Sequence, residues 1–207
     1  MNPVPLFLII VSLPLLLGGC GEKEPVVEVK PVEEVPLNPN LKYEIKDGTV
    51  TITGCDESAS GKLVIPATIK GKTVTSIGIG AFENCESLTS ITIPESVTSI
   101  GDGAFYECAS LTSIVMGEGV TSIGKGAFAK CLKLTSITIP DSVTSIGDST
   151  FVGSASLTAV IFLGDAPKTT GNIFSNPCKV TIYRKPEAKG WGDTFAGRPV
   201  KLTSEKQ

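Results

Sequence analysis

The chain has 207 residues, of which 41% are hydrophobic and 6% aromatic, and its formal net charge is −3. This slightly acidic balance offers no basic surface for a polyanion, so we expect no nucleic-acid partner. The sequence contains no histidine, which removes the commonest general base and the commonest metal ligand. We therefore expect a protein that is not an enzyme and that uses no cofactor or metal.

Residues 1–19 have the features of a lipoprotein signal peptide. The apolar run Leu6 to Leu17 is too short to cross a bilayer core of ~30 Å as a helix, but it suits a signal-peptide core. It ends in Leu17-Gly18-Gly19-Cys20, which resembles the lipobox of bacterial lipoproteins, so Cys20 is the expected lipidation site. The leader MNPVP lacks Lys and Arg, which keeps an uncleaved weak anchor as the alternative. By the same resemblance, Gly21 in place of Asp favours the outer membrane or cell surface.

Residues 20–40 form the predicted lipid anchor and tether. This stretch mixes charged residues with four prolines, Pro25, Pro31, Pro36 and Pro39. Such a composition does not pack into a core and favours polyproline II at about 3.1 Å per residue. We therefore expect a spacer that holds the rest of the chain up to ~60 Å from the membrane.

Residues 41–62 are predicted to form an N-terminal capping hairpin. Two short β-forming runs, Tyr43–Ile45 and Val50–Ile52, flank Lys46-Asp47-Gly48. Asp-Gly is a tight-turn signal between antiparallel strands. A solenoid must protect its terminal edges, and this hairpin suits that purpose.

Residues 63–178 are organised by a 23-residue repeat. Three successive copies read VTSIGIGAFENCESLTSITIPES (74–96), VTSIGDGAFYECASLTSIVMGEG (97–119) and VTSIGKGAFAKCLKLTSITIPDS (120–142). The same interval separates Phe82, Phe105, Phe128, Phe151 and Phe174. A residue type that returns once per coil stacks on its own copies, so these columns predict one continuous core.

Each copy contains two extended pieces and one turn. L-T-S-I-x-I alternates apolar and small polar residues, which predicts parallel strands with Ile91 and Ile93 inward and Ser90 and Thr92 outward. V-T-S-I-G is a second short strand, whose glycine is expected to permit a sharp turn. The threonine of this piece is expected to reflect β-propensity. G-A-F-x-x-C is read as a short helical turn.

These copies resemble the BspA-like class of bacterial leucine-rich repeats, which look like LTSITIPxSVTSIGxGAFxxC. The resemblance implies an α/β leucine-rich-repeat solenoid, predominantly parallel β with short helical turns and capped ends. It also implies secretion or surface attachment and a role in adhesion to proteins or other cells. An extended repeat surface suits the binding of an extracellular protein or glycan. The alternative is a structural envelope lipoprotein without a dedicated ligand.

The candidate binding surface follows from strand alternation. Its members are the outward positions of the L-T-S-I-x-I strands: Ser90, Thr92, Ser113, Val115, Ser136, Thr138 and Ile161. Val115 and Ile161 stand where neighbouring copies carry Thr, so they are the best contact candidates.

Residues 179–207 are predicted to be a C-terminal cap. Val180–Tyr183 is expected to be the last strand, and Trp191 and Phe195 in the segment after it are expected to cover the final coil.

Three cysteines, Cys85, Cys108 and Cys131, occupy one repeat column that Ser154 interrupts. Side chains in such a column point in parallel about 4.8 Å apart, a poor geometry for a disulfide. We therefore expect free buried thiols that pack as small hydrophobes. The pairing of Cys55 and of Cys178 is left open.

Overall fold

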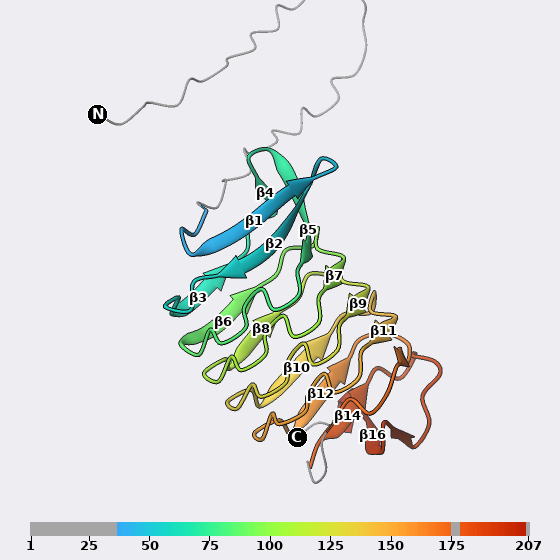
Figure 1. Cartoon of the computed structure of the whole chain (residues 1–207). Coiled ribbons are helices and arrows are strands. Elements are labelled where there is room, and N and C mark those ends of the chain that lie inside the picture. The colour runs from blue at the N-terminus through green and yellow to red at the C-terminus, as the bar shows by residue number, and fades with distance from the viewer. Residues whose placement is uncertain (1–36, 175–178, 206–207) are drawn as a thin grey trace, which may run out of the picture. The chain divides into compact units, whose positions relative to one another are not determined.

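The computed structural model describes residues 37–174 and 179–205, which belong to the compact unit Glu34–Gln207. Within this unit, coils of 23 residues stack from the N-terminal hairpin (blue in Figure 1) to the C-terminal strands (red). We number them coil 1 (74–96), coil 2 (97–119), coil 3 (120–142) and coil 4 (143–165). Parallel pairing aligns Ile77 with Ile100, Ile100 with Ile123, and Ile123 with Ile146. The predicted solenoid and its period are therefore confirmed.

The V-T-S-I strands form one side of the coils. They belong to an eight-stranded sheet in the order β1 (Leu41–Lys46), β2 (Thr49–Cys55), β5 (Lys72–Ile77), β7 (Ser99–Ile100), β9 (Ser122–Ile123), β11 (Ser145–Ile146) and β13 (Lys168–Thr169), with β4 (Thr68–Ile69) pairing β5. β1 and β2 are antiparallel and turn at Asp47 and Gly48, both of which have positive φ. β2 then pairs in parallel with β5, so the hairpin covers the N-terminal edge of the sheet.

The L-T-S-I-x-I strands form a second side, which is divided into two sheets. The first has the order β3 (Gly61–Val64), β6 (Leu88–Thr92) and β8 (Ser113–Val115). The second has the order β10 (Ser136–Ile139), β12 (Ala159–Phe162), β14 (Thr181–Arg184), β16 (Arg198–Leu202) and β15 (Thr194–Phe195), and a short 3₁₀ helix (Thr203–Glu205) follows.

The core contains an unbroken stack of phenylalanine rings. Phe82, Phe105, Phe128, Phe151 and Phe174 have successive ring centroids 5.0–5.9 Å apart and interplanar angles of 6–19°. All five side chains are buried. The predicted ladder is confirmed through its fifth member.

The third side of the coil is not helical, which corrects the reading of G-A-F-x-x-C. The amide of Phe82 donates to the carbonyl of Ala104 in the next coil at 2.7 Å, and the amide of Phe105 donates to that of Ala127 at 2.8 Å. In an α-helix these amides would donate to carbonyls four residues earlier in the same segment. The segment instead makes tight turns joined across coils.

The glycines of V-T-S-I-G serve close packing between coils. An added Cβ at Gly124 would lie 2.5 Å from the amide nitrogen of Asp102, and one at Gly147 would lie 2.4 Å from that of Lys125. Neither glycine has positive φ, whereas Gly103 and Gly126, two residues after their V-T-S-I-G glycines, have φ near +60°. The sharp turn therefore falls at this second glycine, while the first lets neighbouring backbones touch.

The cysteine column is polar as well as packed. The thiols of Cys108 and Cys131 donate to the carbonyls of Phe82 (3.1 Å) and Phe105 (3.3 Å) in the preceding coil. Ser154 continues the pattern, because its hydroxyl donates to the carbonyl of Phe128 at 2.8 Å. The carbonyls of Phe82 and Phe105 also accept the amides of Cys85 and Cys108, so each thiol adds a second hydrogen bond to its carbonyl. Cys55, Cys85, Cys108 and Cys131 are all free and buried; Cys178 lies outside the described residues.

At the C-terminal end, Val180–Tyr183 is not the last strand. β16 pairs in parallel with β14, and β15 folds back on β16. The sequence RPVKL does not predict strand β16, because it combines a proline with two cationic residues. Trp191 and Phe195 cover the last coil as predicted, with ring centroids 4.9 Å and 5.7 Å from that of Phe162.

Candidate functional site

Two rows of outward side chains cross the L-T-S-I-x-I strands and bring all seven predicted surface residues onto one face. The serine row contains Ser90, Ser113 and Ser136, continued by Ala159 and Thr181. The mixed row contains Thr92, Val115, Thr138, Ile161 and Tyr183. We call the two rows together the outward face. In Figure 1 it lies over strands β6, β8, β10, β12 and β14.

The mixed row carries the apolar surface of this face. Val115 is 54% exposed, while Ile161 and Tyr183 are half-buried. Val64, which is 44% exposed, precedes Thr92 in the same row, and Lys201 follows Tyr183. Burying such exposed apolar area against a partner is favourable at roughly 25 cal/mol per Å².

Val64 and Tyr183 were not predicted as members of the face. Val64 belongs to a strand before the first complete copy, and Tyr183 follows Ile161 by 22 residues instead of 23. The signal is the strand alternation: K-L-V-I aligns with S-I-T-I, which places Val64 beside Thr92, and V-T-I-Y aligns with T-S-I-T.

The outward face from Ser90 to Tyr183 contains no charged residue, although 19% of the chain is charged. Charges lie at the ends of the rows, where Lys62 pairs with Ser90 and Lys201 with Tyr183, and on turns. On the third side of the coils, for example, the Nζ of Lys130 contacts a carboxylate oxygen of Glu107 at 2.5 Å and lies 4.8 Å from the centre of the Tyr106 ring. Between the two lysines, the side chains of the outward face carry only hydroxyl and apolar groups.

Hydroxyl groups on this face differ from those on its borders. In the V-T-S-I strands, the hydroxyls of Thr98, Thr121 and Thr144 donate to the threonine carbonyl of the preceding coil at 3.0–3.2 Å. Thr112 and Thr158 do the same at the start of the L-T-S-I-x-I strands. Within the described residues, the hydroxyls of the outward face form no hydrogen bond with another protein group: Ser90, Thr92, Ser113, Ser136, Thr138, Thr181 and Tyr183.

The outward face is crossed by a seam between β8 and β10, two strands that do not pair. The amide of Thr112 donates to Thr89 and that of Thr158 to Thr135, both at 2.9 Å. Among the described residues, no corresponding bond joins Thr135 to Thr112. At the seam, Pro140 occupies the position of Gly117, whose amide donates to Ile93, and proline has no amide hydrogen to make the corresponding bond.

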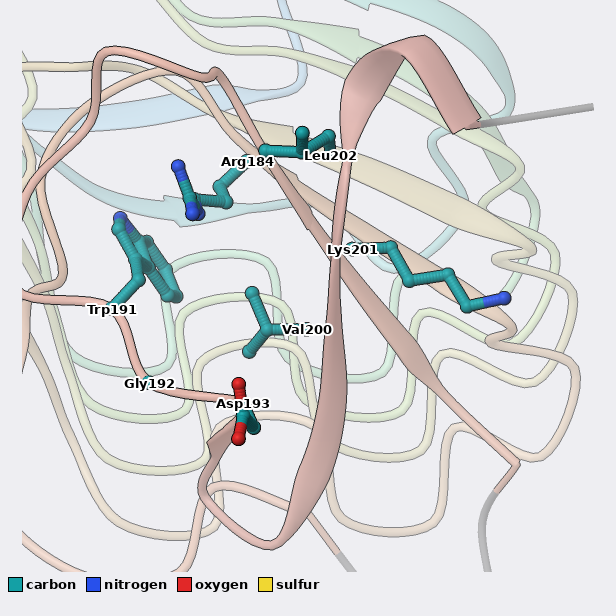
Figure 2. Close-up of a pocket in the computed structure, with 7 residues that line it drawn as sticks. All are labelled: Arg184, Trp191, Gly192, Asp193, Val200, Lys201 and Leu202. Atoms are coloured by element: carbon teal, nitrogen blue, oxygen red, sulfur yellow. The ribbon is translucent and has the colours of Figure 1, made fainter.

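A small cavity of about 180 Å³ lies at the C-terminal cap, beside Arg184, Trp191, Asp193 and Val200 (Figure 2). The indole Nε1 of Trp191 donates to the carbonyl of Gly164 at 3.2 Å, and its ring packs on Phe162. The Nη1 of Arg184 donates to the carbonyls of Lys185 and Pro186 at 3.1 and 3.0 Å. Trp191 therefore acts as a lid, as predicted.

Other predicted features fall outside this face. Cys20, its signal peptide and most of the tether lie outside the described residues. In the described part of the chain, no helix is long and apolar enough to span a membrane. No group of three or more metal-binding side chains occurs there either.

Comparison with known proteins relates this architecture to bacterial repeat proteins. Residues 62–181 match the BspA type leucine rich repeat region in six copies. A leucine-rich repeat protein of T. pallidum is 29% identical, with a TM-score of 0.66 over 73% of this chain and 71% of its own. One from Bacteroides capillosus is 38% identical, with a TM-score of 0.55 over 62% of this chain and 97% of its own. Comparison with curated proteins found no match.

Proposed function

We propose that this chain, which belongs to the BspA-type leucine-rich repeat family, is a binding module that holds an extracellular protein or glycan against its outward face. The supporting observation is the contrast between hydroxyl rows. The threonines that border the face mostly use their hydroxyls within the fold, whereas the face itself presents free hydroxyls beside exposed Val115. The family fold supplies a rigid frame along which many weak contacts can be spread.

The location of the protein is part of this proposal. A lipid on Cys20 would fix the chain to the bacterial envelope, and two or more acyl chains give the stable anchoring that one does not. The supporting feature is the sequence Leu17-Gly18-Gly19-Cys20. Metabolic labelling with a clickable fatty acid tests it: the wild type should take up label, and Cys20→Ser should lose both the label and the membrane pellet. An unlabelled wild type contradicts the anchor.

Binding is tested with a matched pair of variants. Val115→Glu places a charge on the outward face, whereas Leu132→Glu places one at a similarly exposed apolar residue (47%) on a turn. Arrays of extracellular proteins and glycans should retain the wild type and Leu132→Glu but lose Val115→Glu. Because the face carries no charge, retention should persist from about 0.1 to about 0.5 M NaCl.

Two outcomes contradict this assignment. Equal loss in both variants would place the contact elsewhere. Failure of the wild type to bind any array member would favour the alternative, a structural envelope lipoprotein without a dedicated ligand.

A further inference from the structure

The first member of the cysteine column differs from the others. The thiols of Cys108 and Cys131 each donate a hydrogen bond to a phenylalanine carbonyl in the preceding coil, at 3.1–3.3 Å. Cys85 has no phenylalanine before it at that interval, and its sulfur lies 3.8 Å from the carbonyl oxygen of Asp56. Its thiol therefore lacks the short backbone bond that occupies the other two.

The residue before Asp56 carries a second thiol. Cys55 is the last residue of β2 and immediately precedes Asp56, whose side chain fixes the following turn by accepting the amide of Ser58 at 2.8 Å. Cys55 is 8% exposed and Cys85 is fully buried. The sulfur of Cys85 reaches the backbone of the residue that follows Cys55, and each thiol perturbs the pKa of the other, so the two are neighbours.

The argument against disulfides within the column does not extend to this pair. Cys85, Cys108 and Cys131 are one repeat apart and point in parallel, whereas Cys55 and Cys85 are 30 residues apart and belong to two different elements. Cys55 comes from the hairpin and Cys85 from a turn of coil 1, so their approach is not fixed by the repeat spacing.

We propose that Cys55 and Cys85 form an intramolecular disulfide that fastens the N-terminal hairpin to coil 1. The oxidant is a small disulfide or a disulfide-exchange protein. The thiolate of Cys55 attacks one sulfur of the donor and releases one thiol, which leaves a mixed disulfide on Cys55. The thiolate of Cys85 then attacks the Cys55 sulfur and releases the second thiol. The two protons lost by Cys55 and Cys85 end on the two released donor thiols, and two electrons reduce the donor.

The environments of the thiols agree with this order. The hydrogen bond from Cys85 lowers the pKa of Cys55, and the same bond together with burial raises the pKa of Cys85. Burial raises the pKa of Cys108 to about 12 and also raises that of Cys131. Because the thiolate is the attacking species, Cys55 should react first, and Cys108 and Cys131 should stay reduced.

Oxidised glutathione provides the test on the full-length protein. After oxidation, free thiols are alkylated in denaturant and the disulfides are mapped by mass spectrometry. Trypsin leaves Cys85 and Cys108 in one peptide, because no Lys or Arg lies between Lys72 and Lys125; cleavage after Glu95 separates them. The expected product links Cys55 to Cys85, with Cys108 and Cys131 alkylated.

Serine variants test the order of the steps. Cys85→Ser should stop at glutathione on Cys55, and Ser154 shows that the column accepts a hydroxyl. Cys55→Ser should leave Cys85 alkylated, while Cys108→Ser should form the bond at the wild-type rate. The proposal is overturned by persistent thiols on both residues, by glutathione remaining on Cys55 of the wild type, or by a bond from either to Cys20, Cys108 or Cys178.

Discussion

Replacing Phe105 with Ala removes a ring from the middle of the phenylalanine stack. Phe105 is fully buried and stacks on Phe82 at 5.0 Å and on Phe128 at 5.3 Å. A buried Phe→Ala change costs about 3–5 kcal/mol, from lost burial plus the cavity. Backbone hydrogen bonds between coils hold the residues around Phe105 in place, so the cavity left by its ring cannot close easily. We therefore expect a loss in the upper half of this range.

Phe174→Ala is the matched control, because Phe174 is equally buried but, among the described aromatic rings, stacks only on Phe151, at 5.6 Å, while the guanidinium of Arg198 lies 5.7 Å from its centre. Because Phe174→Ala loses one aromatic contact and Phe105→Ala loses two, the free energy of unfolding should fall by about 0.5–1.5 kcal/mol less in Phe174→Ala. Urea unfolding followed by circular dichroism and by the fluorescence of Trp191, the one tryptophan of the chain, measures both variants. Equal losses below about 1 kcal/mol would refute the ladder as the source of stability.

Three further predictions concern the coil contacts. Gly124→Ala should lower the free energy of unfolding by about 3 kcal/mol, because the new Cβ would lie 2.5 Å from backbone atoms of the neighbouring coil. Gly126→Ala should lower it by about 1 kcal/mol, because this residue has φ near +60° and its Cβ would have no atom closer than 4.0 Å. Similar urea midpoints for the two variants would contradict the packing argument. At about pH 8, a thiol reagent should modify Cys108 roughly a thousandfold more slowly in the native protein than after denaturation, because burial raises the pKa of this thiol from 9.0 to about 12. The rate in the native protein should rise with pH, and a fast, pH-independent reaction would exclude this. Amide hydrogen exchange at Thr135 should exceed that at Thr112 and Thr158 by on the order of tenfold, since only Thr135 lacks an acceptor across the seam; equal protection would disprove the seam.

The repeat made the core predictable. Because a column such as Phe82 to Phe174 recurs with nearly the same neighbours, the inward side chains could be assigned before any coil was seen. The third side was mistaken for a helix because G-A-F-x-x-C spaces Phe and Cys as one helical turn does. Alternate backbone donors of this segment, such as the amide of Phe82, bond to the next coil, and a pattern read within one copy does not contain that information.

The candidate surface was predictable to the same extent. Strand alternation assigned Val115 and Ile161 to the outward face, and both lie there. The seam could not be predicted, because neighbouring copies have nearly the same sequence and the 23-residue period implies the same pairing at every step. The sequence leaves a pairing of Cys55 with Cys85 open, because the enlarged loop before Leu63 breaks the 23-residue count.

A repeat rich in hydroxyl groups could suggest that every row of polar side chains is a binding surface. The rows differ, however, in whether their hydroxyls form hydrogen bonds within the fold. A threonine whose hydroxyl donates to a carbonyl of the preceding coil, as Thr121 does to Thr98, contributes to coil stacking and has that proton engaged. Ser113 and Ser136 carry similar groups with no protein partner among the described residues, so water satisfies them until a ligand replaces it. Replacing ordered water with equivalent hydrogen bonds changes the free energy little, whereas covering Val115 is favourable. Affinity for the outward face should therefore come mainly from its apolar residues, with the serine row selecting partners that can replace the water.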